Sequence, residues 1–289
     1  MDLFINAVLS GIAEGASFGL VALGIVMVYK ATRVLNFAQA EIGTLSIYLA
    51  WELTQVGVPI LIAAVVVLVA AAMMGGATEL LLRPLAGAQR LTITVVTLGI
   101  ATALGAAQIV LFGPDPHVLP ALLDGTAIRL GLIDFTWMRL LALILTGGLG
   151  VGLFLFFKRT LFGLGVLAAA QDQTALKLMG LPFNSVSMFV WASGAVLTAM
   201  AGIVLAPVIG NFTPFFITTS VFIPALAAAL VGGLTSLPGA FVGGLVVGIA
   251  QNIAKSYALQ IPGSEFMVVF ALITIVLLVR PQGLMGKEA

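Results

Sequence analysis

The chain has 289 residues, of which 61% are hydrophobic and only 8% are charged, with a formal net charge of +1. Soluble domains carry about a quarter charged residues, so this composition excludes an ordinary soluble domain and indicates an integral membrane protein. The balanced charge gives no basis for nucleic-acid binding, and the absence of cysteine excludes disulfides, zinc thiolates and redox motifs.

Apolar windows along the chain predict an all-α fold, a polytopic bundle of transmembrane helices in one domain over residues 1–289. Several windows approach or exceed the ~20 residues that a helix needs to cross a bilayer core. The windows are 6–29, 34–55, 58–82, 91–112, 139–157, 184–207, 216–234, 239–258 and 264–280. The last three are short or interrupted by Pro224, Pro238 and Pro262, so we expect eight or nine spans.

The first window carries glycines at four-residue spacing, Gly11, Gly15 and Gly19. The stretch from Gly15 to Gly19 also matches the G-x-S-x-G nucleophile pattern around Ser17, but that pattern needs a strand-to-helix turn and a histidine partner. Neither is expected inside an apolar helix. We therefore interpret the glycines as a surface for close contact with another helix.

Two acidic residues, Glu14 and Glu41, fall deep inside predicted spans. An ionisable group in a membrane is costly and is by default a functional candidate. These carboxylates either line a polar translocation path or are satisfied by neighbours such as Asn36, Gln39 and Thr44. The sequence leaves both possibilities open.

The basic residues predict the orientation of the chain. Nine of the twelve Lys and Arg residues lie in four regions that the nine-span count places on one side: Lys30 and Arg33, Arg83 and Arg90, Lys158, Arg159 and Lys177, and Arg280 and Lys287. Short loops rich in Lys and Arg stay in the cytoplasm. We therefore expect an external N-terminus, a cytoplasmic C-terminus and an ordered external cap formed by loop 113–138.

The cytoplasmic loop 158–183 is too long for a tight turn, and it concentrates polar residues in a chain that has few. These are Gln171, Asp172, Gln173, Thr174 and Lys177. Residues 164–179 placed on a helix form an apolar face with Gln171 in its middle, and the other four polar side chains lie outside this face. Gly180 and Pro182 end the helix. The segment is either a connector lying along the membrane or a docking element for a cytoplasmic partner.

The region 207–263 is interrupted by five prolines, Pro207, Pro214, Pro224, Pro238 and Pro262, and by the pair Gly232–Gly233. Broken helices survive in a membrane where they are buried in protein or line a cavity. We therefore expect helices to bend here. With Glu14, Asn36, Gln39 and Glu41, the two glycines are candidates for the lining of a translocation path.

Several blocks together resemble the permeases of branched-chain amino acid ABC importers, the LivH type, in family order and over nearly the whole chain. The blocks are "VMVYKATRVLNFAQAEIGTLSIYLAW", "LLRPLAGAQRLTITVVTLGIATALGAAQIVLFGPDP", "RTLFGLGVLAAAQDQTALKLMGLPFNSV", "AALVGGLTSLPGAFVGGLVVGIAQ" and "LVRPQGLMG".

The resemblance implies a permease subunit of the bacterial inner membrane, paired with a second, LivM-type permease chain. Two cytoplasmic ATPases, which bind ATP and Mg, and an external solute-binding protein complete such an importer, and no cofactor or metal is expected in this chain. Residues 163–182 become the coupling helix that sits in a groove of the ATPase. Its expected contact residues are Gly163, Ala169, Gln171, Asp172, Lys177, Leu178 and Gly180, of which Asp172 and Gly180 match the family pattern and Ala169 and Leu178 match it loosely.

This chain departs from the family pattern at two places. Gln39–Ala40 replaces a His-Gly pair before Glu41, and the coupling loop lacks the usual arginines. The solute is therefore either a branched-chain amino acid or a related small polar solute such as urea, a short amide or a small carboxylate. The alternatives are an ion- or proton-coupled transporter or channel that uses Glu14 or Glu41, and a membrane scaffold without transport activity.

Overall fold

The structure is a computed structural model that describes residues 2–286 except 124, 131–132, 170–181 and 259. Its helices are α1 (Asp2–Thr32), α2 (Ala38–Gln55), α3 (Ile60–Leu82), α4 (Arg90–Phe112), α5 (Trp137–Arg159), α6 (Leu161–Ala169), α8 (Phe183–Ile209), α9 (Ile223–Gly232), α10 (Leu237–Tyr257) and α11 (Ser264–Val279). Two short helices, the 3-10 turn η1 (Arg83–Leu85) and the π-helix η2 (Thr218–Phe222), and two strands, β1 (Thr126–Leu130) and β2 (Ile133–Thr136), complete the described part.

The predicted all-α polytopic fold is confirmed, and the predicted windows coincide with the observed helices to within a few residues. The span count differs. Among the described residues, six helices are long and apolar enough to cross a membrane, and two apolar helices, 218–232 and 264–279, are shorter. At 1.5 Å per residue, a 15-residue helix covers less than the ~30 Å of a hydrocarbon core. The α2 helix has 18 residues and carries many polar side chains, so it falls outside the six as well.

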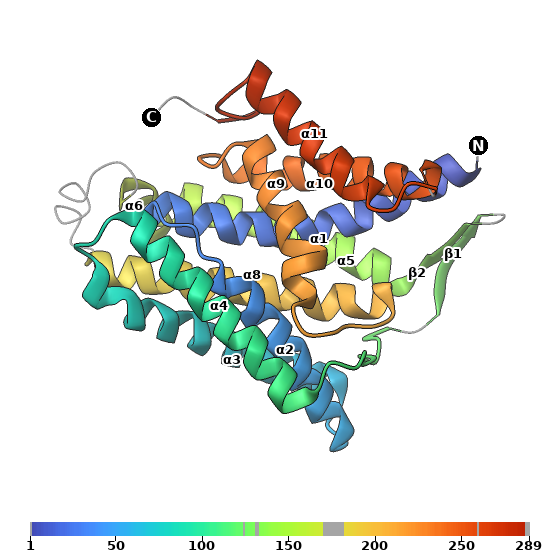
Figure 1. Ribbon diagram of the computed structural model, residues 1–289, viewed down its shortest axis with the longest axis horizontal. Helices are drawn as coiled ribbons and strands as arrows, with labels where there is room; N and C mark the ends of the chain where they lie inside the picture. The colour runs from blue at the N-terminus through green and yellow to red at the C-terminus, as the bar shows by residue number, and fades with distance from the viewer. Residues whose placement is uncertain (1, 124, 131–132, 170–181, 259, 287–289) are drawn as a thin grey trace.

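The first helix is the centre of the bundle. It packs against α10, α8, α5 and α9 (Figure 1), and 89% of its most apolar stretch is buried, against 17% for α5. The α3, α4 and α5 helices instead expose most of their apolar side chains on the outside of the molecule. A lipid-facing surface is apolar by necessity, so burial and hydrophobicity are decoupled in this fold.

The contact between α1 and α10 depends on glycine. A Cβ atom built on Gly15 would lie 2.6 Å from the carbonyl oxygen of Gly244, and one on Gly248 would lie 2.3 Å from the Cα of Gly15. On Gly11, it would lie 2.6 Å from the Cα of Ile249. The prediction that these glycines form a close helix contact is therefore confirmed. The partner surface is the four-residue repeat of α10.

The chain is interrupted between α8 and α9. The α8 helix ends at Ile209 with Gly210 as its C-cap, whose φ is +100°, and residues 211–215 are not helical. Asn211 is exposed, but Phe212 is buried, and the N–H groups of Phe215 and Ile217 donate to side chains of α4 and α2, which satisfies backbone that no helix satisfies here. The predicted break in this region is present.

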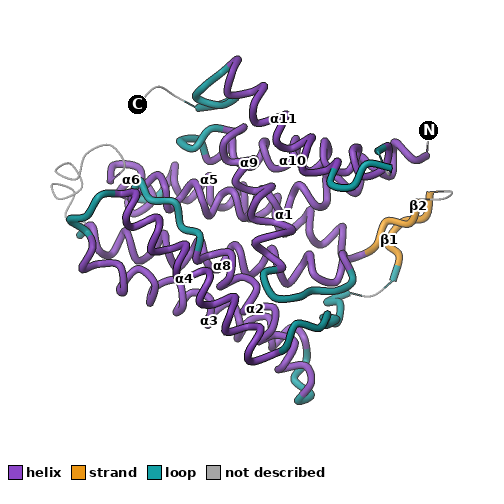
Figure 2. Tube along the Cα trace, in the orientation of Figure 1, coloured by secondary structure: helices purple, strands orange, loops and turns teal. Residues whose placement is uncertain are grey.

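The external cap expected at 113–138 contains a β-hairpin that the sequence analysis missed. The antiparallel strands β1 and β2 pair Arg129 with Asp134 and Thr126 with Thr136. Figure 2 shows the hairpin projecting from one end of the helical bundle, next to the start of α5. Strand pairs of this length carry too little periodicity to stand out in an apolar sequence.

Candidate functional site

Glu41 lies in the first turn of α2 and is fully buried. Gln108 of α4 donates its amide to the Glu41 carboxylate at 3.0 Å and to the Glu41 carbonyl oxygen at 3.1 Å. The hydroxyl of Thr218, the first residue of η2, donates a short hydrogen bond to the other carboxylate oxygen. Glu41 thus links α2 to α4 and to the first residue of η2, which follows the break after α8.

The same network satisfies backbone groups of the break between α8 and α9. The N–H of Phe215 donates to the side-chain oxygen of Gln108 at 3.3 Å, and the N–H of Ile217 donates to the Thr44 hydroxyl at 3.0 Å. Phe215 has a φ of +63°, and its ring lies where a side chain at Gly105 would be, since a Cβ there would come within 2.1 Å of the ring. Each unsatisfied backbone group at membrane depth costs several kcal/mol. The network therefore holds the irregular segment in place.

The contacts of this cluster are hydrogen bonds. The described part of the chain contains no group of three or more His, Cys, Asp or Glu side chains able to hold a metal ion. The partners of Glu41 are Gln108, Thr218 and, of the three neighbours expected from the sequence, Thr44. Asn36 and Gln39 do not bond to it. Of the two possibilities for Glu41, a path residue or a satisfied buried acid, this geometry favours the second.

Asn36 and Gln39, in contrast, have buried polar atoms without partners. They are 1% and 0% exposed, and within the described part of the chain neither the oxygen nor the nitrogen of either amide is hydrogen-bonded. Gln39 lies against α8, because a Cβ on Gly194 would sit 3.1 Å from its Oε1. Asn36 lies in the turn between α1, which ends at Thr32, and α2, and Gln39 lies in the first turn of α2. Buried amides normally have hydrogen-bond partners. A bound polar molecule would therefore complete the hydrogen bonding of Asn36 and Gln39.

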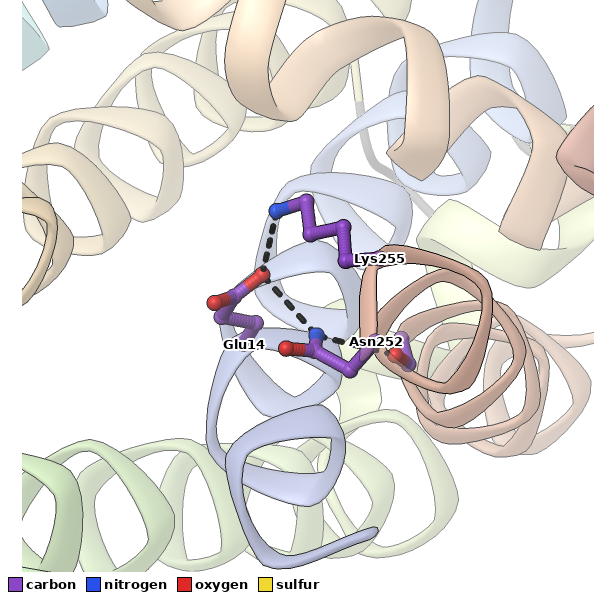
Figure 3. A network of polar contacts seen from close by, with 4 residues as sticks. Glu14, Asn252 and Lys255 are labelled. Carbon is purple, nitrogen blue, oxygen red and sulfur yellow. Dashed lines mark hydrogen bonds and ion pairs between the residues drawn. The ribbon is translucent and has the colours of Figure 1, made fainter. Parts of the chain in front are cut away.

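Glu14 lies on α1 and faces Asn252 and Lys255 of α10 (Figure 3). Its carboxylate accepts from the Asn252 amide at 3.0 Å and pairs with Lys255 at 3.3 Å. The Glu14 side chain is 16% exposed and Lys255 is 43% exposed. Glu14 is thus a paired charge, apart from the Glu41 network.

Gly232 and Gly233 lie at the end of α9, away from Thr218 at the start of the same segment. Gly233 has a φ of +102° and ends the helix, and a Cβ on Gly232 would lie 2.0 Å from the carbonyl oxygen of Gly239. The C-terminal residues Leu284 and Met285 donate backbone hydrogen bonds to the carbonyls of Val231 and Gly232. These glycines make a tight turn between α9 and α10 and do not join the other candidate path residues.

Comparison with known proteins decides the class of this arrangement. Residues 7–278 match the family described as "Branched-chain amino acid transport system / permease component". The chain belongs to this permease family. It is thus a multi-pass inner-membrane transport component and not an enzyme.

Full-length relatives agree with this assignment. The permease is 28% identical to the branched-chain amino acid permease protein BraD of Pseudomonas aeruginosa, and 29% identical to LivH of Escherichia coli strain K12, over 98% of this chain and 96% of each relative. It is 27% identical to a probable LivH of Methanocaldococcus jannaschii, over 93% of this chain and 88% of the relative.

The fold of this permease is also found in a solved structure. PsaBC from Streptococcus pneumoniae, in complex with Fab, aligns with a TM-score of 0.51 at 16% identity, covering 98% of this chain and 93% of that chain. At this identity, the likeness concerns the arrangement of helices alone.

Of the coupling residues expected in this permease, two lie in the described part. Gly163, in α6, donates its N–H to the hydroxyl of Thr160 at 3.0 Å, and a Cβ there would come within 2.3 Å of the Phe156 carbonyl oxygen. Ala169 is the last residue of α6. Gln171, Asp172, Lys177, Leu178 and Gly180 lie outside the described residues.

An aromatic cluster at the Phe112 end of α4, opposite the Arg90 end, was not predicted. The His117 ring lies 4.2 Å from the Trp51 ring and 5.7 Å from the Tyr48 ring, and Tyr48 stacks on Phe112 at 4.4 Å. His117 and Phe212 exchange backbone hydrogen bonds, both of 2.9 Å. The cluster ties loop 113–125 to the break after α8. Its members come from three separate segments of the sequence. Only His117, the single histidine of the chain, stood out in the sequence as a candidate.

Proposed function

We propose that this chain is the permease subunit that forms the translocation path of an ATP-binding-cassette importer. Separate cytoplasmic ATPases drive the transport. The observation that carries the proposal is the match to the permease family over residues 7–278, together with similarity to LivH relatives along 98% of the chain. A second permease chain, two ATPases that bind ATP and Mg, and an external solute-binding protein complete the importer. The transported solute is a branched-chain amino acid or a small polar relative such as urea, a short amide or a small carboxylate.

The aromatic contacts around α6 support a mechanical role for the loop between α5 and α8. The Phe189 ring of α8 lies 5.5 Å from Phe156 of α5 and 5.0 Å from Phe162 of α6. Because α6 follows α5 after one residue, Thr160, these rings join three helices at the root of the loop. A push on the coupling segment 163–182 by the ATPases is then transmitted to α5 and α8 as one body.

Asn36 and Gln39 are the residues that we assign to solute contact, and Glu41 is the anchor of the adjacent break. The unpaired amides of Asn36 and Gln39 offer both donors and acceptors, which suits a zwitterionic amino acid, urea or an amide equally. Glu14 and Glu41 already have partners, which disfavours a proton- or ion-coupled mechanism that uses them.

The orientation that goes with this function places the basic end of the bundle in the cytoplasm. The end of α1, the α3–α4 loop and the start of α8 line one pocket, so these regions share one end of the molecule. Lys30 also donates to the carbonyl of Thr235 in the α9–α10 turn at 3.1 Å. The N-terminus is then external and the C-terminus cytoplasmic.

The test is uptake by the reconstituted complex. Proteoliposomes that hold both permeases and the ATPases, with the binding protein outside, should accumulate one of the solute classes only when ATP is inside. Labelled leucine, urea, acetamide and a short carboxylate form the panel. Uptake by this chain alone, driven by a proton or sodium gradient, would refute the proposal.

A further inference from the structure

A pocket of about 330 Å³ lies at the basic end of the bundle. Its walls come from the end of α1, the α3–α4 loop and the first turns of α8. It is therefore bounded by three segments that are distant in sequence, and it is separate from the Glu41 network and from Asn36 and Gln39, none of which line it.

The wall of this pocket is electropositive. Arg90, the first residue of α4, is exposed and makes no salt bridge within the described ranges. Arg83 binds the carboxylate of Glu79 through its Nε atom, at 2.9 and 3.1 Å, so the acid of the pocket is neutralised and the outer guanidinium nitrogens are left for another anion. Two arginines against one glutamate leave a net positive charge.

The N-terminus of α8 adds to this charge. Phe183 and Asn184 line the pocket, and their N–H groups precede the hydrogen bonding of the helix itself. The preceding residue, Pro182, provides no side-chain cap. The positive end of the helix dipole thus faces the same space as the two arginines, an arrangement that favours anions.

Ser187, one turn further along α8, points to a ligand independently of these charges. It lines the pocket, its residue is only 5% exposed, and its hydroxyl is not one of the fully enclosed polar atoms without a partner, so it is open to the pocket. An oxyanion in the pocket would accept a hydrogen bond from this hydroxyl.

The surroundings of the pocket determine which anion fits. Leu80 and Leu81 of α3 and Leu91 of α4 are 48%, 65% and 71% exposed, next to the arginines in sequence. An apolar surface directly beside an anion site at a helix end suits a molecule with a charged head and hydrocarbon chains. We propose that this pocket binds the phosphate group of an anionic phospholipid, with the acyl chains lying along α3 and α4.

Native mass spectrometry of the full-length chain in detergent tests this proposal, with phosphatidylglycerol, phosphatidylcholine and inorganic phosphate as probes. Phosphatidylglycerol should bind more tightly than phosphatidylcholine. Arg90→Gln should weaken its binding about fivefold, and Ser187→Ala should weaken it about threefold. Arg159→Gln, an equal change of charge at the end of α5 and outside the pocket, should leave the affinity unchanged.

Three results would overturn the assignment. Equal binding of phosphatidylglycerol and phosphatidylcholine would show that the pocket does not distinguish lipids by the net charge of the headgroup. An equal loss in Arg159→Gln would show that only the net charge matters. Displacement of phosphatidylglycerol by inorganic phosphate at similar concentration would identify a site for free anions instead. Because Arg90 and Ser187 are outside the Asn36–Gln39 region, failure here leaves the proposed transport function untouched, and uptake measurements judge that separately.

Discussion

At the scale of residues, the buried polar side chains of this permease fall into two kinds. Glu41 uses both carboxylate oxygens for Gln108 and Thr218, whereas the amides of Asn36 and Gln39 have no partner among the described residues. In a membrane, a satisfied polar group stabilises the fold, and an unsatisfied one costs free energy unless a ligand completes it. The two kinds therefore respond differently to mutation.

Glu41→Ala should destabilise the protein. It removes the acceptor of the half-buried Thr218 hydroxyl and one of the two acceptors of the Gln108 amide, which keeps its hydrogen bond to the backbone carbonyl of residue 41. The expected cost is about 1–3 kcal/mol. Thermal unfolding in detergent should show a lower midpoint than for the native chain. Glu52→Ala, at an exposed position of the same helix, is the control and should change little. Equal midpoints for the two variants would contradict the anchoring role of Glu41.

Gln39→Leu should separate stability from transport. Leucine of similar size removes two unpaired buried polar atoms, so the unfolding midpoint should stay or rise. If Gln39 contacts the solute, ATP-driven uptake by the reconstituted importer should fall about fivefold or more, by the loss of about 1 kcal/mol or more of hydrogen bonding. Unchanged uptake would remove Gln39 from the path.

At the scale of elements, several helix pairs bring their backbones into close contact through glycine. The glycines of α1 and α10 interdigitate, and Gly75 of α3 lies where a Cβ would come within 2.7 Å of Ala195 of α8. Close approach maximises dispersion contacts where water provides no driving force between helices.

Gly248→Ala should open the contact between α1 and α10. The added methyl group meets the Cα of Gly15 at 2.3 Å, a backbone atom that cannot move aside on its own. Overpacking of this kind costs about 1–3 kcal/mol. The unfolding midpoint should fall.

Gly152→Ala is the matched control for this change. It lies in α5 with nothing within 4 Å of its Cβ position. Alanine is a better helix former than glycine by about 1 kcal/mol. The unfolding midpoint of Gly152→Ala should therefore be unchanged or higher than that of the native chain. A fall as large as that of Gly248→Ala would mean that the α1–α10 contact is not the cause.

At the scale of the whole molecule, α1 is a central helix surrounded by others, and the pocket lined by Arg83, Arg90 and Phe183 joins three basic regions at one end of the bundle. The His117–Phe212 bridge joins loop 113–125 to the segment after α8 at the Phe112 end of α4. This polarity is what a cytoplasmic drive and an external delivery of solute require.

The absence of cysteine makes the orientation directly testable. Asp115→Cys and Lys158→Cys each place one thiol at an exposed loop or helix end. On intact cells, a membrane-impermeant maleimide should label Asp115→Cys and not Lys158→Cys. Permeabilised cells should label both. The reverse pattern would invert the topology.

Much of the architecture could be predicted from the sequence, because a membrane requires nearly every helix to be long, apolar and hydrogen-bonded within itself. The windows therefore follow the helices closely, and the spacing of Gly11, Gly15 and Gly19 predicted a close helix contact that the structure contains. The number of membrane-spanning helices was harder to predict, because residues 218–232 form an apolar helix that is too short to cross a membrane by its length alone.

The partners of the buried polar groups could not be predicted. Gln108 lies 67 positions from Glu41, and Thr218 lies 177 positions from it, and both are unremarkable within apolar segments. Of the three neighbours expected from the sequence, Thr44 interacts with the carboxylate, whereas Asn36 and Gln39 make no hydrogen bond to it. Only the packing of α2, α4 and the break shows which carboxylate is satisfied and which amides are not.

The sequence by itself determined a polytopic permease with an interrupted region after residue 207, because hydropathy, proline and glycine act locally on a helix in lipid. The tertiary structure alone decided that Glu41 anchors that interruption, that Gly232 and Gly233 lie at a turn apart from it, and that Arg90, Phe183 and Ser187 share one pocket. Side-chain hydrogen bonds and pockets join helices distant along the chain, and no local pattern records them.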